Sequence, residues 1–318
     1  MSLTIQFDPS HSSDIINYYY TNYSTCEKQT SYFATWQFLA ISTHSILIIQ
    51  IPLVVFTSYC ILQKTPKVMG SLRWAMLNVH FWSTFMDILL CSLVTPYLIF
   101  PSFAGFTIGL FSALGVPTSV QAYLGFISIG FMFNSISALF ENRSSSFEMN
   151  RFRFERTTTR FAFFISSGAV TALLLIPVFS NLPDQNFGKL KTLSIYPCPP
   201  EEFFQFPIFT LITERFWGFW KTKALQKMFF IGNLVQISVP SLFWALPGSM
   251  LFPIYYFRYY NQALINIGVV FVSLHGLASM IAMLLIHAPY RNFILELLGR
   301  CGSQKIGIGM ASEPVSLV

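Results

Sequence analysis

Charge is what this sequence lacks most. Of its 318 residues, 10% are charged and 53% are hydrophobic, whereas a soluble globular domain carries about 25% charged residues. Between Arg73 and Glu141, the only Asp, Glu, Lys, Arg or His residues are His80 and Asp87. Apolar runs of roughly 20 residues cross a ~30 Å hydrocarbon core as helices. The sequence therefore predicts a polytopic helical membrane protein.

Other absences exclude further classes of protein. The opening residues, MSLTIQFDPSHSSD, contain no apolar h-region of a cleavable signal peptide, so the first span is expected to act as the insertion signal. The chain has no HExxH, no GxSxG, no glycine-rich phosphate loop and no paired-cysteine metal spacing. We therefore expect no enzyme, no cofactor and no metal. The net charge of +6 indicates no nucleic-acid partner, because most basic residues flank the apolar runs.

The apolar runs and the charged segments between them predict a topology. Segments rich in lysine and arginine stay in the cytoplasm, which places Gln63–Arg73, Glu141–Arg160 and Glu214–Lys227 inside and leaves the amino terminus and Asn181–Glu202 outside. We expect an extracellular tail over 1–32, an all-α transmembrane bundle over 33–287 and a cytoplasmic tail over 288–318. The runs long enough to cross are Phe33–Leu62, Trp74–Phe100, Val116–Phe140, Phe161–Ser180, Met228–Phe257 and Leu264–His287.

One crossing does not fit this scheme. In the stretch FTLITERFWGFWKTKALQKMFF, Phe209–Phe230, only Phe203–Thr213 separates an outside segment from an inside one. Eleven helical residues rise about 16 Å, roughly half of the hydrocarbon core. Extending the helix to Trp220 places Glu214 and Arg215 in lipid, at several kcal/mol unless they pair. The fifth crossing is predicted to be shortened or missing.

Nine short motifs resemble one receptor family. KTPKVM, LNVHFWSTFMD, TPYLIFP, LGVP, ALFENRSSS, YPCPPEEFF, YYNQ, LHG and HAPYRNF follow one another in the order found in nematode serpentine receptors of class H (Srh). The resemblance covers about Tyr18 to Leu298. It implies a seven-helix chemoreceptor at the plasma membrane that binds an unknown small molecule and couples to a heterotrimeric G protein, with a receptor dimer as a further possible partner.

The same resemblance also indicates that part of the fifth crossing is missing. In the family, a full apolar helix lies between segments like EEFFQFPIFTLITERFW and KTKALQKMFF, which are nearly joined here. A truncated, non-signalling product is therefore one alternative, either retained in the endoplasmic reticulum or dimerising with intact relatives. A transporter is a weaker alternative, because it predicts several intramembrane charges or a repeated half.

A polar core is expected in the middle of the bundle. Asp87 is the only acid within a clean span, and an intramembrane carboxylate is a candidate functional site. His80 lies seven residues earlier, on the same helix face, and His275 reaches a similar depth in the last span. We expect these residues to bias resting and active packings, or else to form a purely structural pair. Asn134 and Asn266 are expected to join them.

The cytoplasmic end of the third span carries the candidate G-protein contacts. Glu141 and Arg143 resemble in chemistry the acidic-arginine motif of rhodopsin-like receptors, but residues two apart on a helix do not face each other. We predict that Arg143, Arg151, Arg153 and Arg156 face the G protein. The alternative is that these arginines only anchor the loop inside.

Five further positions are singled out. Pro240, within a later span, is predicted to be a hinge or a static kink. Cys26 and Cys198 are the only cysteines that the topology places outside, where disulfides persist. Asn22 begins the glycosylation sequon NYS. Cys301 follows PYRNFILELLGRC, a predicted amphipathic helix, and is a palmitoylation candidate.

Overall fold

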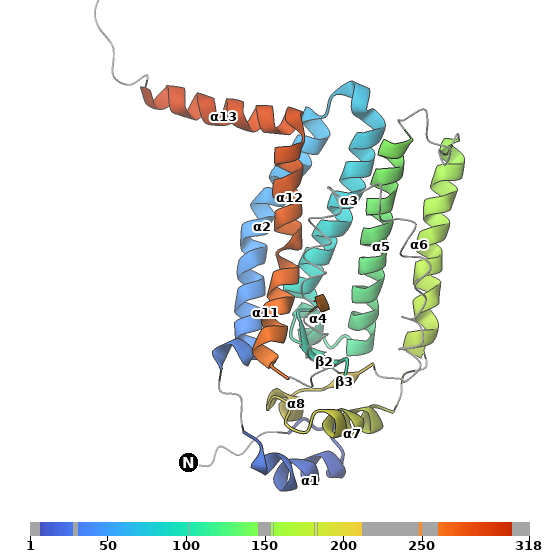
Figure 1. Ribbon diagram of the computed structural model, residues 1–318, viewed down its shortest axis with the longest axis vertical. Helices are drawn as coiled ribbons and strands as arrows, with labels where there is room; N and C mark the ends of the chain where they lie inside the picture. The colour runs from blue at the N-terminus through green and yellow to red at the C-terminus, as the bar shows by residue number, and fades with distance from the viewer. Residues whose placement is uncertain are drawn as a thin grey trace, which may run out of the picture.

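The computed structural model describes residues 7–27, 31–100, 102–145, 154, 156–180, 182, 184–211, 248–249 and 260–306. Five helical segments in these ranges are long and apolar enough to cross a membrane, and they stand roughly parallel in Figure 1. The predicted transmembrane helical bundle is thus confirmed. The segments are α2 (Trp36–Lys64), α3 (Gly70–Ile88) continued by η4 (Leu89–Leu93), α5 (Thr118–Ser144), α6 (Thr157–Ser180), and α11 (Gln262–Ser273) continued by α12 (His275–Ile286).

Two of the crossing helices, α2 and α11, begin where a side chain satisfies a free backbone donor. Thr35 accepts a hydrogen bond from the Phe38 amide before α2, and Asn261 accepts one from the Leu264 amide before α11. Their outward faces are apolar, as Ile48 and Leu173 illustrate with 70% and 62% of their surface exposed. A spanning helix satisfies its own backbone, so an apolar exterior suits it to lipid.

The second crossing ends earlier than the sequence predicts. Helical structure stops at Leu93 rather than near Phe100, and Thr95 takes a φ of 41°. Pro96 has no amide hydrogen to continue the helix. The chain instead forms β1 (Pro96–Ile99), which pairs antiparallel with β2 (Ala104–Thr107), placing Tyr97 opposite Phe106. The expectation of an all-helical chain missed this hairpin.

A cap covers one end of the bundle. We use this name for α1 (Ser13–Thr21), η1 (Tyr23–Thr25), α7 (Gln185–Ile195), α8 (Glu202–Gln205) and the sheet β1–β2–β3, where β3 is Phe209–Thr210. At the opposite end, α13 (Ala288–Ile306) runs sideways from α12 (Figure 1). The remaining short helices are η2 (Tyr32–Ala34), η3 (Lys67–Met69) and α4 (Leu110–Ala113).

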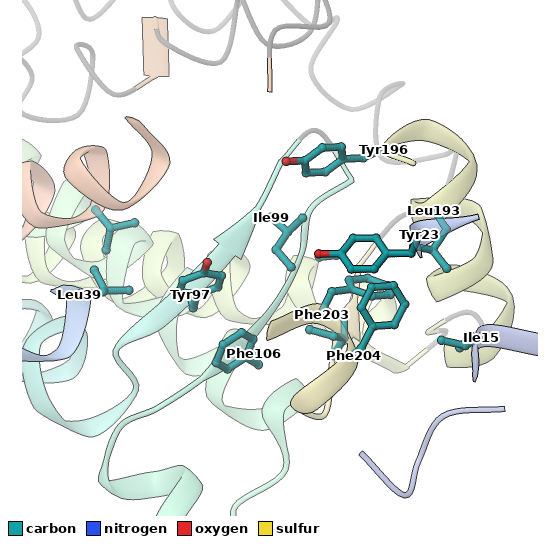
Figure 2. Packing of buried hydrophobic residues seen from close by; sticks show 13 residues of the cluster. Ile15, Tyr23, Leu39, Tyr97, Ile99, Phe106, Leu193, Tyr196, Phe203 and Phe204 are labelled. Atoms are coloured by element: carbon teal, nitrogen blue, oxygen red, sulfur yellow. The ribbon is translucent and has the colours of Figure 1, made fainter. Parts of the chain in front are cut away.

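Aromatic side chains fill the cap. Figure 2 shows Tyr23, Phe203 and Phe204 packed beside Tyr97 and Phe106 of the hairpin. The Tyr97 hydroxyl donates to the Ala34 carbonyl, and the Gln262 amide donates to the Leu98 carbonyl, so the sheet is tied to the starts of α2 and α11. A disulfide joins Cys26 to Cys198. The amino-terminal tail is therefore an ordered part of the cap from residue 7 to residue 27.

The described part of the segment considered for a fifth crossing, Phe203–Leu211, belongs to the cap. Phe203 and Phe204 are fully buried there. The Thr210 amide donates to Gln185 of α7, and the Leu211 amide donates to the Phe103 carbonyl. Pairing with β2 satisfies the backbone of β3 in place of a helix. Phe203–Leu211 therefore crosses nothing, and Leu211 lies at the same end of the bundle as Tyr260, which stacks on Tyr196.

A buried histidine and a buried lysine fasten the tail to the rest of the cap. The Lys189 ammonium donates to Ser10 Oγ at 3.0 Å and to His11 Nδ1 at 3.3 Å. His11 Nε2 lies 3.1 Å from the Phe203 carbonyl and donates to it when Nδ1 accepts. Burial, and then the charge of Lys189, lowers the pKa of His11, while the more distant Asp8 opposes this. The neutral imidazole of His11 is therefore the form that these contacts favour in the folded cap.

Acidification is expected to loosen the tail. In the unfolded chain His11 takes up a proton near pH 6.5, but in the folded cap only at lower pH, so stability is full above pH ~6.5 and falls as the pH drops below it. Hydrogen exchange of the α1 amides, corrected for intrinsic rates, should be faster at pH 5.5 than at pH 7.5. A His11→Gln variant should lose this dependence, and an equal dependence in that variant would assign the effect to another group.

Candidate functional site

A large cavity lies directly beneath the sheet of the cap. It has a volume of about 450 Å³ and is walled by β1, β2, the ends of α3 and η4, one face of α5, and α11. Ligand pockets commonly have volumes of about 300–1,000 Å³. Met86 of α3 and Val272 of α11 line its side towards the middle of the bundle. The cavity therefore borders the candidate polar core.

The last crossing is interrupted beside this cavity. Helix α11 ends at Ser273 and α12 begins at His275, with Leu274 in a turn between them. The Ser273 carbonyl accepts a hydrogen bond from Gln50 of α2 at 3.1 Å. His275 Nδ1 lies 2.9 Å from the Val272 carbonyl. Side chains thus take over backbone groups that a continuous helix would satisfy. We call this turn and its partners the joint.

Asp87 holds the joint from the second crossing. Its Oδ1 lies 3.2 Å from His275 Nδ1, and both side chains are buried. The carboxylate also lies against the backbone of Gly276, where an added Cβ would fall 1.5 Å from Asp87 Oδ2. Only glycine leaves room for this approach. Ionisable groups at such depth pair with one another, and the structure brings Asp87 and His275 together.

The other residues predicted for the core lie apart from this pair, so the core is smaller than expected. His80 Nε2 lies 3.0 Å from Ser58 Oγ of α2. Asn134 donates to the Phe164 carbonyl of α6. Asn266 donates to the carbonyls of Phe33 and Thr35, near the cap. Asn134 and Asn266 thus each donate a hydrogen bond to a backbone carbonyl of another segment, because each side chain faces that segment.

A smaller cavity leads from the joint towards the α13 end. It has a volume of about 60 Å³ and touches His275 and His80 at one end. Leu139 and Ile286, which also line it, are close in sequence to Arg143 and His287. A void of this kind deprives its lining of packing contacts. The side chains around this void are therefore less tightly packed than those of a filled core.

Two polar contacts join helices at the α13 end. Arg160 of α6 pairs with Glu141 of α5 at 2.6 Å, and Ser145 also donates to that carboxylate. Arg143 Nη2 lies 3.2 Å from His287 Nε2, which follows α12. Glu141 and Arg143 thus have separate partners, as their spacing of two residues required. Sequence reasoning missed the roles of His287, Arg160, Gln50 and Gly276, although His287 stands in the motif HAPYRNF and Gly276 in LHG.

The remaining predicted residues fall in different places. Arg156 is exposed just before α6. Asn22 is exposed at the end of α1, and its glycosylation stays a prediction. Cys301 falls within α13, and its palmitoylation also stays a prediction. Arg151, Arg153 and Pro240 lie outside the described residues.

A bundle of membrane-length helices, with a cavity under a cap at one end and an ion pair and a hydrogen bond between helices at the other, is the architecture of a multi-pass membrane receptor. The chain belongs to the family described as Serpentine type 7TM GPCR chemoreceptor Srh, whose profile matches residues 34–220 and 220–300. It is 29% identical over 323 residues to Serpentine receptor class H-72 of Caenorhabditis elegans, covering 89% of this chain and 92% of that protein. No solved structure matches at a significant level.

The family match also bears on the anomalous stretch. Its two segments meet at residue 220, inside Phe209–Phe230. The break in the family pattern therefore falls where the charge pattern leaves too little chain for a crossing. Residues 212–247 lie outside the part of the chain that the structure describes, so the missing fifth span stays a prediction. The family is one of receptors rather than of enzymes.

Proposed function

We propose that this protein is a chemoreceptor that binds a small molecule in the cavity beneath the cap and signals to a heterotrimeric G protein at the α13 end. The observation that supports this most directly is the contact between cavity and joint. Val272 lines the cavity, and its carbonyl lies 2.9 Å from His275 Nδ1. A ligand that displaces Val272 therefore acts on the turn that sets the direction of α12.

The route from the joint to the effector end follows α12. This helix runs from His275 to Ile286 and carries His287 directly after its end. A change of direction at Leu274 moves His287 relative to α5 and breaks its contact with Arg143. A ligand shifts such an equilibrium only as far as it prefers one state. Loosely packed side chains around the smaller cavity allow this movement.

Freed Arg143 is the proposed contact for the G protein, with Arg156, Arg151 and Arg153 extending the basic surface. In the resting state the guanidinium of Arg143 is hydrogen-bonded to His287, and Glu141 forms an ion pair with Arg160. The cap then faces outside and α13 faces the cytoplasm of the plasma membrane. This orientation agrees with the basic segments Gln63–Arg73 and Glu141–Arg160, which both adjoin the α13 end.

The test compares two partners of one contact. His287→Ala removes the restraint and leaves Arg143 free, so ligand-independent G-protein activation should rise about fivefold or more, the effect of roughly 1 kcal/mol of coupling. Arg143→Ala removes the proposed effector contact and should reduce activation to background. Activation would be measured as Gα–Gβγ dissociation in cells and normalised to receptor at the surface.

The exposed Lys67, in the loop between α2 and α3, supplies a matched control. Lys67→Ala should leave activation within the range of the unmodified receptor. Equal loss in both His287→Ala and Arg143→Ala would mean that the contact is only structural. Absence of any coupling in a receptor that reaches the surface would favour the alternative of a non-signalling family member.

A further inference from the structure

The lining of the larger cavity restricts what it can hold. No Asp, Glu, Lys, Arg or His side chain lines it among the residues that the structure describes. Its walls are made of leucine, valine, isoleucine and methionine side chains, with phenylalanine rings from the hairpin, α5 and β3. Asp87 follows the lining residue Met86 but has its carboxylate against His275 and Gly276. A charged ligand would find no counter-ion in the described part of this wall.

Three polar side chains are among the described lining, and two of them, those of Thr107 and Gln121, already have protein partners; the third is Thr118, at the start of α5. Thr107 Oγ1 lies 2.6 Å from Ser112 Oγ. Gln121 Nε2 donates to the Val116 carbonyl at 2.7 Å and to Ser112 Oγ at 3.2 Å. A ligand that competes for these groups must break existing hydrogen bonds, which makes the net gain small. Specific binding therefore depends on apolar contact and shape.

The volume sets the size of the molecule. A cavity of about 450 Å³ has room for on the order of fifteen non-hydrogen atoms if each takes about 30 Å³, as in liquid water. Removing an ion from water without a partner costs far more than removing a neutral polar group, which itself costs a few kcal/mol. Size and lining together favour a neutral, mostly apolar molecule.

We propose that the cavity beneath the cap binds an uncharged, predominantly apolar molecule of on the order of fifteen non-hydrogen atoms, and that it rejects carboxylates and amines of the same carbon skeleton. This ligand class rests on the proposed small-molecule site but not on signalling. Its test is therefore direct binding, which separates its failure from a failure of G-protein coupling.

Three probes of nearly equal size provide the comparison: 2-acetylnaphthalene, 2-naphthoate and 2-naphthylmethylammonium. The full-length receptor in lipid nanodiscs would be titrated with each, using probe fluorescence, and empty nanodiscs would give the partitioning background. The ketone should bind saturably, and the two ions should bind at least about a hundredfold more weakly, since leaving one charge unpaired costs several kcal/mol. Equal or tighter binding of either ion would overturn the proposal.

Gly125 offers a variant that fills the cavity without disturbing its walls. It lines the cavity from α5, and an added Cβ there meets nothing within 4 Å. Gly125→Leu should abolish saturable ketone binding, and Gly125→Ala should weaken it by a smaller factor. Gly70→Leu is the matched control, because Gly70 is equally open but lies at the start of α3 near the α13 end.

Thermal stability of each purified variant would be measured beside binding. Ketone binding that survives in a folded Gly125→Leu receptor would place the ligand elsewhere and overturn the proposal. So would the absence of saturable ketone binding in the folded, unmodified receptor. If Gly125→Leu fails to fold, Gly125→Ala provides the test instead. Its ketone binding should be weaker than that of the unmodified receptor, whereas ketone binding by Gly70→Leu should be unchanged.

Discussion

Gly276→Ala is expected to abolish ligand-independent and ligand-dependent signalling and to destabilise the receptor. The new Cβ would fall 1.5 Å from Asp87 Oδ2, so either the carboxylate or the backbone of the joint must move. Overpacking of this kind typically costs about 1–3 kcal/mol. Because the movement occurs at the turn between α11 and α12, it also misdirects the helix that carries His287. Surface delivery, thermal stability and G-protein activation are the three measurements.

A second substitution distinguishes this clash from a general intolerance of α12. Asp87→Ala removes the carboxylate that the new methyl group meets, so Asp87→Ala combined with Gly276→Ala should be more stable than the sum of the two single effects. Contacting residues commonly show such coupling, of about 0.5–3 kcal/mol. Gly70→Ala, at an open position, should change nothing. Strictly additive destabilisation would show that Asp87 and Gly276 do not touch.

An epitope tag after Val318 is expected to be reached by antibody only in permeabilised cells, whereas a tag before Met1 is reached in intact cells. The described chain has five crossing segments. Leu211 hydrogen-bonds within the cap, and Tyr260 stacks on Tyr196 of the cap, so Leu211 and Tyr260 lie at the same end of the bundle. Two residues on one side of a membrane are separated by zero or an even number of crossings, so the total is expected to be odd. The two termini then lie on opposite sides.

This result excludes a receptor with six crossings, which the charge pattern alone left open. Antibody access to both tags in intact cells would contradict the arrangement of Leu211 and Tyr260 in one cap. Protease protection of microsomes gives the same information when the protein stays in the endoplasmic reticulum. A protected amino terminus with a cleaved carboxyl terminus is the expected pattern there. Retention itself would favour the truncated, non-signalling alternative over the chemoreceptor without changing the predicted sidedness.

Much of the architecture follows from one-dimensional patterns. Long apolar runs between basic segments suffice to predict the membrane-crossing helices, because lipid requires an apolar exterior and an internally satisfied backbone. A lone acid in such a run identified Asp87. Order and spacing of nine motifs indicated the family that the profile match establishes. That Glu141 and Arg143 do not face each other along a helix followed from helix geometry.

Only the tertiary structure decided which segments, distant in the chain, contact one another. The apolar run Phe203–Thr213 is too short to cross the membrane, but nothing in its local pattern indicates that β3 pairs with β2. Likewise the partners of Arg143, Glu141 and Asp87 lie 144, 19 and 188 residues further along the chain. The hydrophobicity of a segment indicates whether it crosses the membrane, and its charge indicates on which side of the membrane it lies. Contacts across the bundle depend on how the helices rotate and pack together, which no single stretch of sequence contains.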